Sequence, residues 1–290
     1  MTVYAVLRLS NHSGIGVADE RLTSFGQRTY DVAKKIHRIP NTSSFVGFAG
    51  SMANGTEVLE TAMGRLEDMR NYSVEDVLSV LEESYREVRD KKLQKALLGR
   101  YGMTIDDFKS GKYDDALKQG LLNTVNDPNG FGVYMIFGGY DSRRDDFIVA
   151  SINYPGFVDK GFPYMVVGSG TDRADLVIGD ELVRLNRETR EDIPLGTGAM
   201  ILMKAARSAW KNIGVGGSGQ VVYVVGDQYK ELDLQNVTLL YNLLYAEERS
   251  MLDRAYVDKT FEGIFKGETN AEYVVGEVSK VLNPEDIMRV

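Results

Sequence analysis

Few side chains in this sequence could act as a nucleophile or a base. The 290 residues include no cysteine and only two histidines, His12 and His37. This excludes thiol nucleophiles and cysteine-based metal sites, and it argues against a serine–histidine triad or a histidine-rich metal site. Thr2 offers a different chemistry. It follows Met1, and a small residue at this position normally permits removal of the initiator methionine, which would leave an α-amine and a hydroxyl on one residue.

An N-terminal threonine can serve as its own base. The α-amine has a pKa of about 7.7–8.0, so it can take the hydroxyl proton near neutral pH, directly or through a water. This is the N-terminal form of activated-nucleophile catalysis, which attacks acyl groups through a covalent intermediate. Thr2 is therefore the candidate nucleophile.

The first fifty residues are expected to form the strands that position this residue. Residues 2–19 are typical of a strand, a turn at 11–14 and a returning strand. A second short pair is expected at 35–39 and 44–49. Helical periodicity begins only after this region.

The rest of the chain alternates helical and strand patterns. Ser73, with Asp76 three residues later, predicts the start of a helix. The expected elements are helices at 54–69 and 74–95, strands at 131–137, 147–152 and 164–167, helices at 174–187 and 197–211, and a strand at 220–225. This order predicts an α+β fold in which two sheets pack face to face between helical layers, a four-layer α-β-β-α sandwich.

The domain organisation follows from the same pattern. Residues 1–230 are expected to form the main domain, interrupted by a polar insertion at 99–129 with a short helix near 113–122. Residues 231–290 are expected to form a helical C-terminal extension with a last helix near 271–282.

Several short motifs occur in the order found in one family. They are Thr2-Val-Tyr-Ala-Val, Val17-Ala-Asp19-Glu20-Arg21, Val32-Ala-Lys34-Lys35-Ile36, Phe48-Ala49-Gly50, Gly168-Ser169-Gly170 and Asn212-Ile-Gly-Val-Gly-Gly217. With these motifs the chain resembles the β-type subunits of the proteasome and their bacterial and archaeal homologues of the Anbu type, within the N-terminal nucleophile (Ntn) hydrolases. The resemblance implies the Ntn-hydrolase form of the sandwich.

The resemblance also implies a role for each matched residue. Thr2 would be the nucleophile and its amine the base. Lys35 would lower the pKa of this pair through its positive charge, and Asp19 would keep Lys35 charged. The backbone N–H of Gly50 would bind the oxyanion. The remaining implied site residues are Arg21, which would brace Asp19, and Ser169 and Asn212, which would orient the amine. By charge alone, Asp19, Arg21 and Lys35 are typical of a plain ion pair at a strand end.

The implied substrate pocket is apolar. The resemblance places the substrate side chain beside the strand that ends at Gly50, near Leu22, Ala33, His37, Phe48 and Met52. These side chains favour a shallow pocket for small or medium apolar groups.

Composition limits the partners. The net charge of −8 argues against nucleic acid, because phosphate binding needs a basic surface. No apolar run is long enough for a membrane span, and the N-terminus lacks a secretory pattern, so a cytoplasmic protein is expected. The Gly-rich segment 214–219 lies between a helix and a strand, the reverse of a dinucleotide site. The sequence thus predicts no cofactor and no metal site.

Three functions remain open. The preferred one is a proteasome-like threonine peptidase that acts on peptides or proteins and forms a homo-oligomer, as a ring or an open assembly. A transpeptidase or a small-molecule amidase would use the same residues, because an acyl-enzyme can be transferred to an amine instead of water. A catalytically inactive assembly subunit is the third, because Asn212 and Val215 stand where the family usually has Asp and Ser.

Overall fold

A computed structural model describes most of the chain. The described residues are 3–19, 21–23, 29–31, 34–69, 72–96, 98–111, 119–120, 122–123, 128–185, 192–210 and 219–279. Within these ranges the protein is mixed α+β, with two five-stranded antiparallel sheets and a small two-stranded sheet.

The first sheet is built around the N-terminal hairpin. Its strands follow the order β10, β1, β2, β11 and β12. Their bounds are β1 Tyr4–Arg8, β2 Ser13–Asp19, β10 Tyr164–Val167, β11 Gly219–Val225 and β12 Gln228–Glu231. The hairpin, β10 and β11 confirm the expected strands. The sequence pattern does not predict β12, because this short strand is largely solvent-exposed and lacks an apolar alternation.

The second sheet follows the order β5, β6, β7, β8 and β9. The bounds are β5 Ile36–Arg38, β6 Ser44–Gly50, β7 Val133–Asp141, β8 Asp146–Asn153 and β9 Phe157–Lys160. A separate pair consists of β3 Arg21–Thr23 and β4 Thr29–Asp31. The expected strands at 35–39, 44–49, 131–137 and 147–152 are confirmed, whereas β9 is a short, mostly exposed strand that the pattern does not predict.

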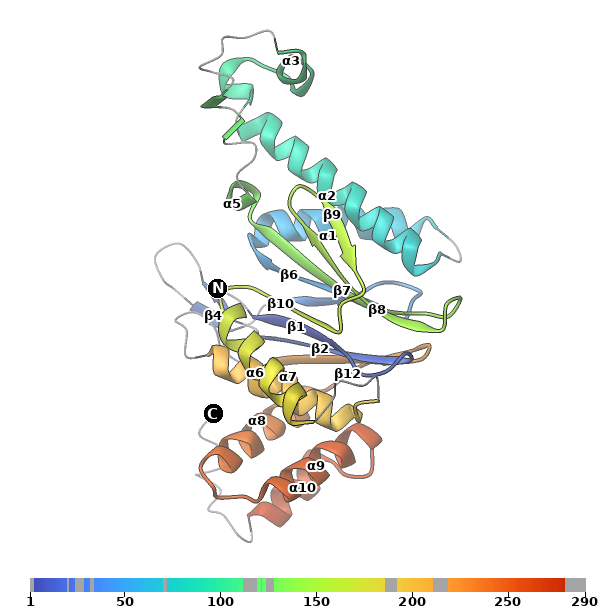
Figure 1. Ribbon diagram of the computed structural model, residues 1–290, viewed down its shortest axis with the longest axis vertical. Coiled ribbons are helices and arrows are strands. Elements are labelled where there is room, and N and C mark those ends of the chain that lie inside the picture. The colour runs from blue at the N-terminus through green and yellow to red at the C-terminus, as the bar shows by residue number, and fades with distance from the viewer. Residues whose placement is uncertain are drawn as a thin grey trace.

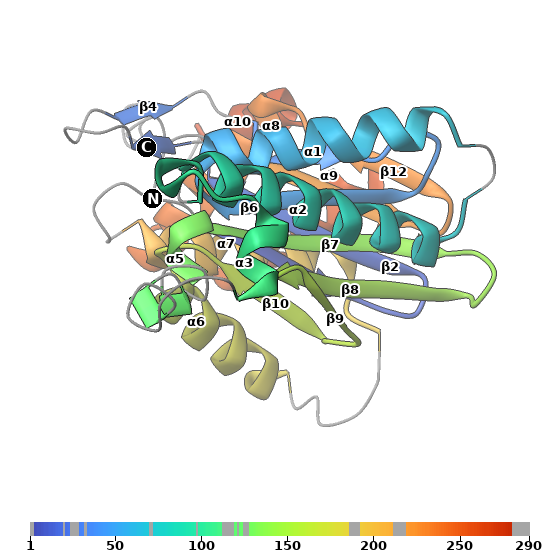
Figure 2. The ribbon, with the colours of Figure 1, turned by 90° about the horizontal axis from the view of Figure 1, so that it is seen from above.

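Helices cover the outer faces of both sheets. Figure 1 shows α1 Met52–Glu67 and α2 Val74–Ala96 over the second sheet, and α6 Thr171–Arg184 and α7 Leu195–Ala209 beneath the first. Figure 2 shows α1 and α2 side by side across the sheet. Ser73 and Asp76 exchange hydrogen bonds at the start of α2, which confirms the predicted helix start.

Strand alternation divides the apolar residues among three cores. In β1, Ala5 and Leu7 belong to the core between the first sheet and the helices α6 and α7, whereas Tyr4 and Val6 lie between the two sheets. In β6, Val46 and Phe48 face α1 and α2, whereas Phe45 and Ala49 lie between the sheets. Successive side chains of a strand point to opposite faces, so each of these strands contributes to two cores.

The C-terminal helices share the core of the first sheet. These are α8 Leu234–Glu248, α9 Arg254–Lys266 and α10 Ala271–Val278. Leu240, Phe261 and Val274 are buried in the same cluster as residues of α7. The segment 231–279 is therefore integrated into the packing of the molecule.

The expected insertion contains a short 3-10 helix at Leu98–Tyr101, α3 Ile105–Ser110 and α5 Pro128–Phe131. Figure 1 shows α3 beyond the end of α2, away from both sheets. Thr104 and Asp107 form a capping box at the start of α3, a signal that the sequence interpretation did not use. Most of the short helix expected near 113–122 lies outside the described residues.

Candidate functional site

A buried ion pair lies at the start of the described chain. The Lys35 ammonium donates a hydrogen bond to Oδ1 of Asp19 over 2.8 Å, and the exposed fractions of the two residues are 1% and 0%. The backbone N–H of Val3 donates to the same oxygen, also over 2.8 Å. In return, the N–H of Asp19 donates to the Val3 carbonyl oxygen over 3.1 Å. Val3 is thus held against the carboxylate that binds Lys35.

Strand register explains this meeting. Asp19 is the last residue of β2, and Tyr4 in β1 is paired with Ala18. In this antiparallel register Val3 lies opposite Asp19. Lys35 directly precedes β5, a strand of the other sheet. The ion pair therefore links the two sheets beside Val3.

Burial of this pair has an energetic cost. Removing both charges from water offsets much of their mutual attraction, and loss of one partner typically destabilises a protein by about 3–5 kcal/mol because the other charge stays buried. A buried ion pair accordingly adds little to the free energy of unfolding compared with apolar residues of similar volume. Its place beside the N-terminal residues favours a functional interpretation of Asp19 and Lys35.

Gln220 supports the backbone of Lys35. This β11 residue is 6% exposed, and its Oε1 accepts hydrogen bonds from the N–H groups of Lys35 (3.2 Å) and Ile36 (3.0 Å). Its Nε2 donates to the Ile36 carbonyl oxygen and to Oε1 of Glu231, each over 3.0 Å. Sequence analysis missed Gln220. The available signal was one polar residue at the start of the otherwise apolar run that forms β11.

Gly50 ends β6 in a conformation that suits only glycine. Its φ is +103°, and a β-carbon there would collide with the carbonyl oxygen of Gly132. The same oxygen accepts a hydrogen bond from the Ser51 N–H over 2.7 Å. Ser51 then caps α1, since its hydroxyl accepts from the Asn54 N–H. The solvent-exposed Gly50 therefore lies directly before the N-terminus of a 16-residue helix.

Ser169 lies in the turn between β10 and α6. The turn begins at Gly168, whose φ is +111°, and the Thr171 hydroxyl donates to the Gly168 carbonyl oxygen over 2.6 Å. A β-carbon on Gly170 would press against the side chain of Val3, so this turn lies beside the start of β1. Ser169 itself is solvent-exposed.

Three residues of the expected substrate pocket lie together on the α1 side of β6. The His37 and Phe48 rings are stacked, with centroids 6.3 Å apart and planes 7° apart. Phe48 is 1% exposed, and Met52 is half-buried against the same core. Burial lowers the pKa of His37, and the nearby charge of Lys34 lowers it further.

The other expected site residues are not described at the side-chain level. Thr2, Ala33 and Asn212 lie outside the described residues. Arg21 and Leu22 belong to β3, where the backbone pairs with Asp31 and Tyr30 of β4. The structure thus brings together Val3, Asp19 and Lys35, with Gly170 of the Ser169 turn against Val3.

Two cavities lie at opposite ends of β6. The first, which we call the Tyr134 cavity, has a volume of about 600 Å³. It is lined by Ala49, Gly50, Tyr134, Val166, Val167, Gly168, Ser169 and Thr171. It thus adjoins both Gly50 and Ser169 of the predicted site.

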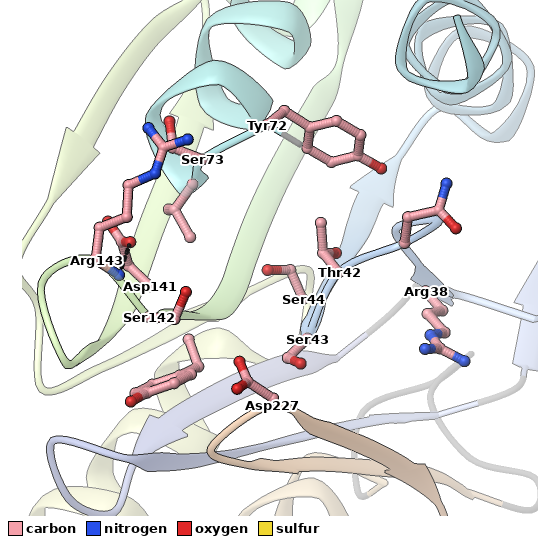
Figure 3. Close-up of a pocket in the computed structure, with 13 residues that line it drawn as sticks. Arg38, Thr42, Ser43, Ser44, Tyr72, Ser73, Asp141, Ser142, Arg143 and Asp227 are labelled. Atoms are coloured by element: carbon pink, nitrogen blue, oxygen red, sulfur yellow. Dashed lines mark hydrogen bonds between the residues drawn. The ribbon is translucent and has the colours of Figure 1, made fainter. Parts of the chain in front are cut away.

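The second cavity, which we call the Arg143 cavity, has a volume of about 290 Å³. Figure 3 shows Ser44 near its centre, Asp141 and Ser142 on one side and Arg38 on the other. Its lining residues are Arg38, Asn41, Thr42, Ser43, Ser44, Tyr72, Ser73, Val74, Tyr140, Asp141, Ser142, Arg143 and Asp227. Six residue steps along β6, or about 20 Å, separate Ser44 in this cavity from Gly50.

Searches against protein-family models and curated protein sequences found no match for this chain. Among the described residues, no group of three or more histidine, aspartate or glutamate side chains is placed to hold a metal ion. Nor does any helix in the described ranges have both the length and the apolar character needed to cross a bilayer.

Proposed function

We propose that this chain is an N-terminal threonine hydrolase that cleaves peptide or other amide bonds through an acyl-enzyme. This is the activity implied by its resemblance to proteasome β-type subunits. Thr2 is the nucleophile after removal of Met1, and Asp19, Lys35 and Gly50 assist it.

The observation that carries the proposal is the position of Val3. Its N–H and the Lys35 ammonium share one oxygen of Asp19, each over 2.8 Å. Thr2 is bonded to this nitrogen, and only two bonds, of about 1.3 and 1.5 Å, separate the nitrogen from the Thr2 α-carbon. In this proposal, Thr2 therefore acts next to the carboxylate that binds the Lys35 ammonium.

The chemistry then needs only groups of this chain and water. The Thr2 α-amine takes the hydroxyl proton while Oγ forms a bond to the acyl carbon of the substrate. The tetrahedral intermediate collapses when the protonated amine gives its proton to the leaving nitrogen and the C–N bond breaks. Water, deprotonated by the same amine, then hydrolyses the threonyl ester. The positive charge of Lys35 favours the deprotonated form of the nucleophile throughout.

The Gly50 end of β6 is suited to a developing negative charge. The helix α1 begins two residues after Gly50, and the N-terminus of a helix carries a partial positive charge. A backbone N–H aimed at an oxyanion is worth on the order of 3 kcal/mol of barrier. These features support Gly50 as the oxyanion donor.

The packing supports the fold that the resemblance implies. One core lies between the two sheets, and each outer face has its own core beneath helices. This is the order expected of a four-layer α-β-β-α sandwich of the Ntn-hydrolase type, with residues 1–230 as the hydrolase domain and 231–290 as its extension. A ring or open homo-oligomer remains part of the proposal, and native mass spectrometry of the full chain tests it.

Cleavage of fluorogenic peptide amides tests the activity. The wild-type chain and the Thr2→Ser variant are expected to release the fluorophore, whereas Thr2→Ala is expected to release none. Equal release by wild type and Thr2→Ala would refute the assignment of Thr2. Added amines would reveal a transpeptidase by forming a new amide product, and absence of any turnover over a broad panel would favour the inactive assembly subunit.

A further inference from the structure

The floor of the Arg143 cavity consists of buried polar side chains. Ser44 and Asp141 both line the cavity and are 0% and 3% exposed. Ser44 of β6 is paired with Gly139 of β7, and Asp141 ends β7 two residues later. Residues two apart on a strand share a face, so Ser44 and Asp141 lie on the same face of the second sheet as Val46, which packs toward α1 and α2. Strand register therefore brings a hydroxyl and a carboxylate together in the cavity.

Two oxygen atoms of this floor, Oγ of Ser44 and Oδ2 of Asp141, have no hydrogen-bond partner among the described residues. The other carboxylate oxygen of Asp141, Oδ1, accepts from the Arg143 N–H over 3.0 Å. The Nε atom of Arg144 lies 3.8 Å from Oδ2, which is too far for a hydrogen bond. Because buried polar atoms are normally hydrogen-bonded, these two oxygens favour a ligand group that donates hydrogen bonds and carries positive charge.

The Ser44 hydroxyl faces the cavity. A β-carbon on Gly139 would lie only 2.1 Å from Oγ of Ser44, so the hydroxyl occupies space that a glycine at position 139 leaves open. Figure 3 shows this hydroxyl turned toward the side of the cavity that Asp141 and Ser142 form. A ligand in the cavity would thus meet the hydroxyl and the carboxylate on the same side.

Hydrogen bonds within the protein hold the walls of the cavity in place. The Thr42 N–H and the Thr42 hydroxyl both donate to the Ile39 carbonyl oxygen, over 3.4 and 3.0 Å. The Tyr72 hydroxyl donates to the Pro40 carbonyl oxygen, which connects the segment before α2 to the turn before β6. The cavity is therefore largely preformed, as sites for small molecules usually are.

Charges of both signs line the cavity in equal number. Asp141 lies in the floor, and the exposed Arg38, Arg143 and Asp227 lie around the rim. An anion without a positive group would meet the buried Asp141 carboxylate, and a cation without a negative group would meet two guanidinium groups. A ligand that carries both an ammonium and a carboxylate group matches this distribution of charge.

We propose that the Arg143 cavity binds a small zwitterion, a free α-amino acid. Its ammonium group donates hydrogen bonds to Oδ2 of Asp141 and Oγ of Ser44, and its carboxylate lies at the rim, where Arg38 and Arg143 supply positive charge. The volume of about 290 Å³ is at the lower end of the range for small-molecule sites, which suits a ligand of this size. The inference does not depend on the proposed function, because it uses none of the residues assigned to the reaction.

Titration of the full chain with matched compounds tests the need for both charges. L-valine, L-serine and L-glutamine are screened by isothermal titration calorimetry, and the tightest of the three is compared with its amide and its N-acetyl derivative. The free amino acid is expected to bind at least about tenfold more tightly than either derivative, because each derivative loses one charged contact. Equal binding of the amide, which keeps only the ammonium, or of the N-acetyl compound, which keeps only the carboxylate, would overturn the inference. Failure of all three amino acids to bind would also overturn it.

Two variants test the residues of the floor. Asp141→Asn removes the charge but keeps an oxygen that can accept from the Arg143 N–H, and it is expected to weaken binding by at least about tenfold. Ser44→Ala is expected to weaken binding by about threefold or more without lowering the melting temperature, and it decides the question if Asp141→Asn does not fold. Asp145→Asn is the matched control, because Asp145 lies in the same turn but does not line the cavity, and asparagine suits its φ of +54°. Equal weakening in Ser44→Ala and the control, or none in either, would contradict the site.

NMR spectroscopy locates the bound amino acid. The amide resonances of Ser44, Gly139 and Ser142 are expected to shift during the titration, whereas those of Gly50 and Ser169 at the other end of the molecule are expected to stay in place. Shifts confined to Gly50 and Ser169 would assign the amino acid to the proposed reaction centre and would overturn the inference. The proposed function fails or holds separately, because peptide cleavage by wild type and Thr2→Ala tests it.

Discussion

The charged side chains near the two ends of β6 differ in their burial. At the Gly50 end, Lys35 and Asp19 are almost completely buried and form an ion pair with each other. At the Ser44 end, Arg143 and Asp227 are exposed, so water screens them, and the buried Asp141 carboxylate accepts a hydrogen bond from the Arg143 N–H. Exposed mixed charges need no function to explain them, whereas a buried ammonium does. The contrast supports the proposal that the reaction takes place at the Gly50 end.

The largest effect that distinguishes the two ends is expected from Lys35→Ala. The variant removes the charge beside the proposed nucleophile and leaves Asp19 buried without its partner. Covalent labelling of Thr2 by a β-lactone should therefore be lost, and the free energy of unfolding should fall by about 3–5 kcal/mol. Urea denaturation and labelling kinetics measure the two effects. Lys34→Ala is the matched control: Lys34 pairs with Glu231 at the surface, where an ion pair contributes about 0–1 kcal/mol. Similar losses of stability and of labelling in Lys35→Ala and Lys34→Ala would contradict the difference between the buried and the exposed ion pair.

A double variant separates chemistry from stability. Asp19→Leu combined with Lys35→Met removes both buried charges, and such replacements are often neutral or stabilising. We expect a folded protein without labelling activity. Retained labelling in this double variant would show that the pair has no part in the reaction.

The next largest effect is expected from Gly50→Ala. The positive φ and the nearby Gly132 carbonyl oxygen force the backbone to move, so labelling should drop by at least about a hundredfold, the usual cost of a lost oxyanion donor. Gly64→Ala in α1 is the control, because Gly64 has open space around it and alanine favours the helix by about 0.5–1 kcal/mol. Thermal unfolding should show a lower melting temperature than wild type for Gly50→Ala and a higher one for Gly64→Ala. A Gly50→Ala protein with unchanged labelling would remove Gly50 from the site.

A smaller effect is expected from Gln220→Leu. The substitution leaves the buried N–H groups of Lys35 and Ile36 without this acceptor, at about 1–3 kcal/mol for each unsatisfied group. The displaced Lys35 should also slow covalent labelling by about tenfold. Gln228→Leu, on the exposed strand β12, is the control. Loss of stability without a change in labelling rate would make Gln220 purely structural.

The smallest effect concerns His37. Because burial lowers its pKa, the folded protein binds its proton less readily than the unfolded chain. The stability that depends on neutral His37 is present above the unfolded pKa of about 6.5 and is lost as the pH falls through and below that value. His37→Gln should therefore lose less stability than the wild type between about pH 7 and pH 5.5 in urea denaturation. Equal losses would show that His37 does not titrate as its burial requires.

Local patterns predicted most of the core elements. Runs of strand-forming residues predicted β1, β2, β6 to β8 and β11, and helical periodicity with the Ser73 cap predicted α2. The prediction of β5 within 35–39 also placed Lys35 beside a strand. These elements were predictable because their buried faces repeat within a few residues of one another.

Contacts that depend on the packing of distant strands could not be predicted. Gln220 meets Ile36 across 184 positions of the chain, so its role appears only when β11 lies against β5. The Tyr134 cavity likewise needs β6, β7 and β10 from both sheets. Exposed strands such as β9 were missed because edge strands carry little apolar pattern.

Intact-protein mass spectrometry before and after treatment with a β-lactone tests the central claim most directly. We predict a wild-type mass without Met1, one covalent adduct per chain, and fragment ions that place the adduct on Thr2. The Thr2→Ala variant should keep its fold and take up no adduct. Complete retention of Met1, or an adduct that persists in Thr2→Ala, would contradict the account.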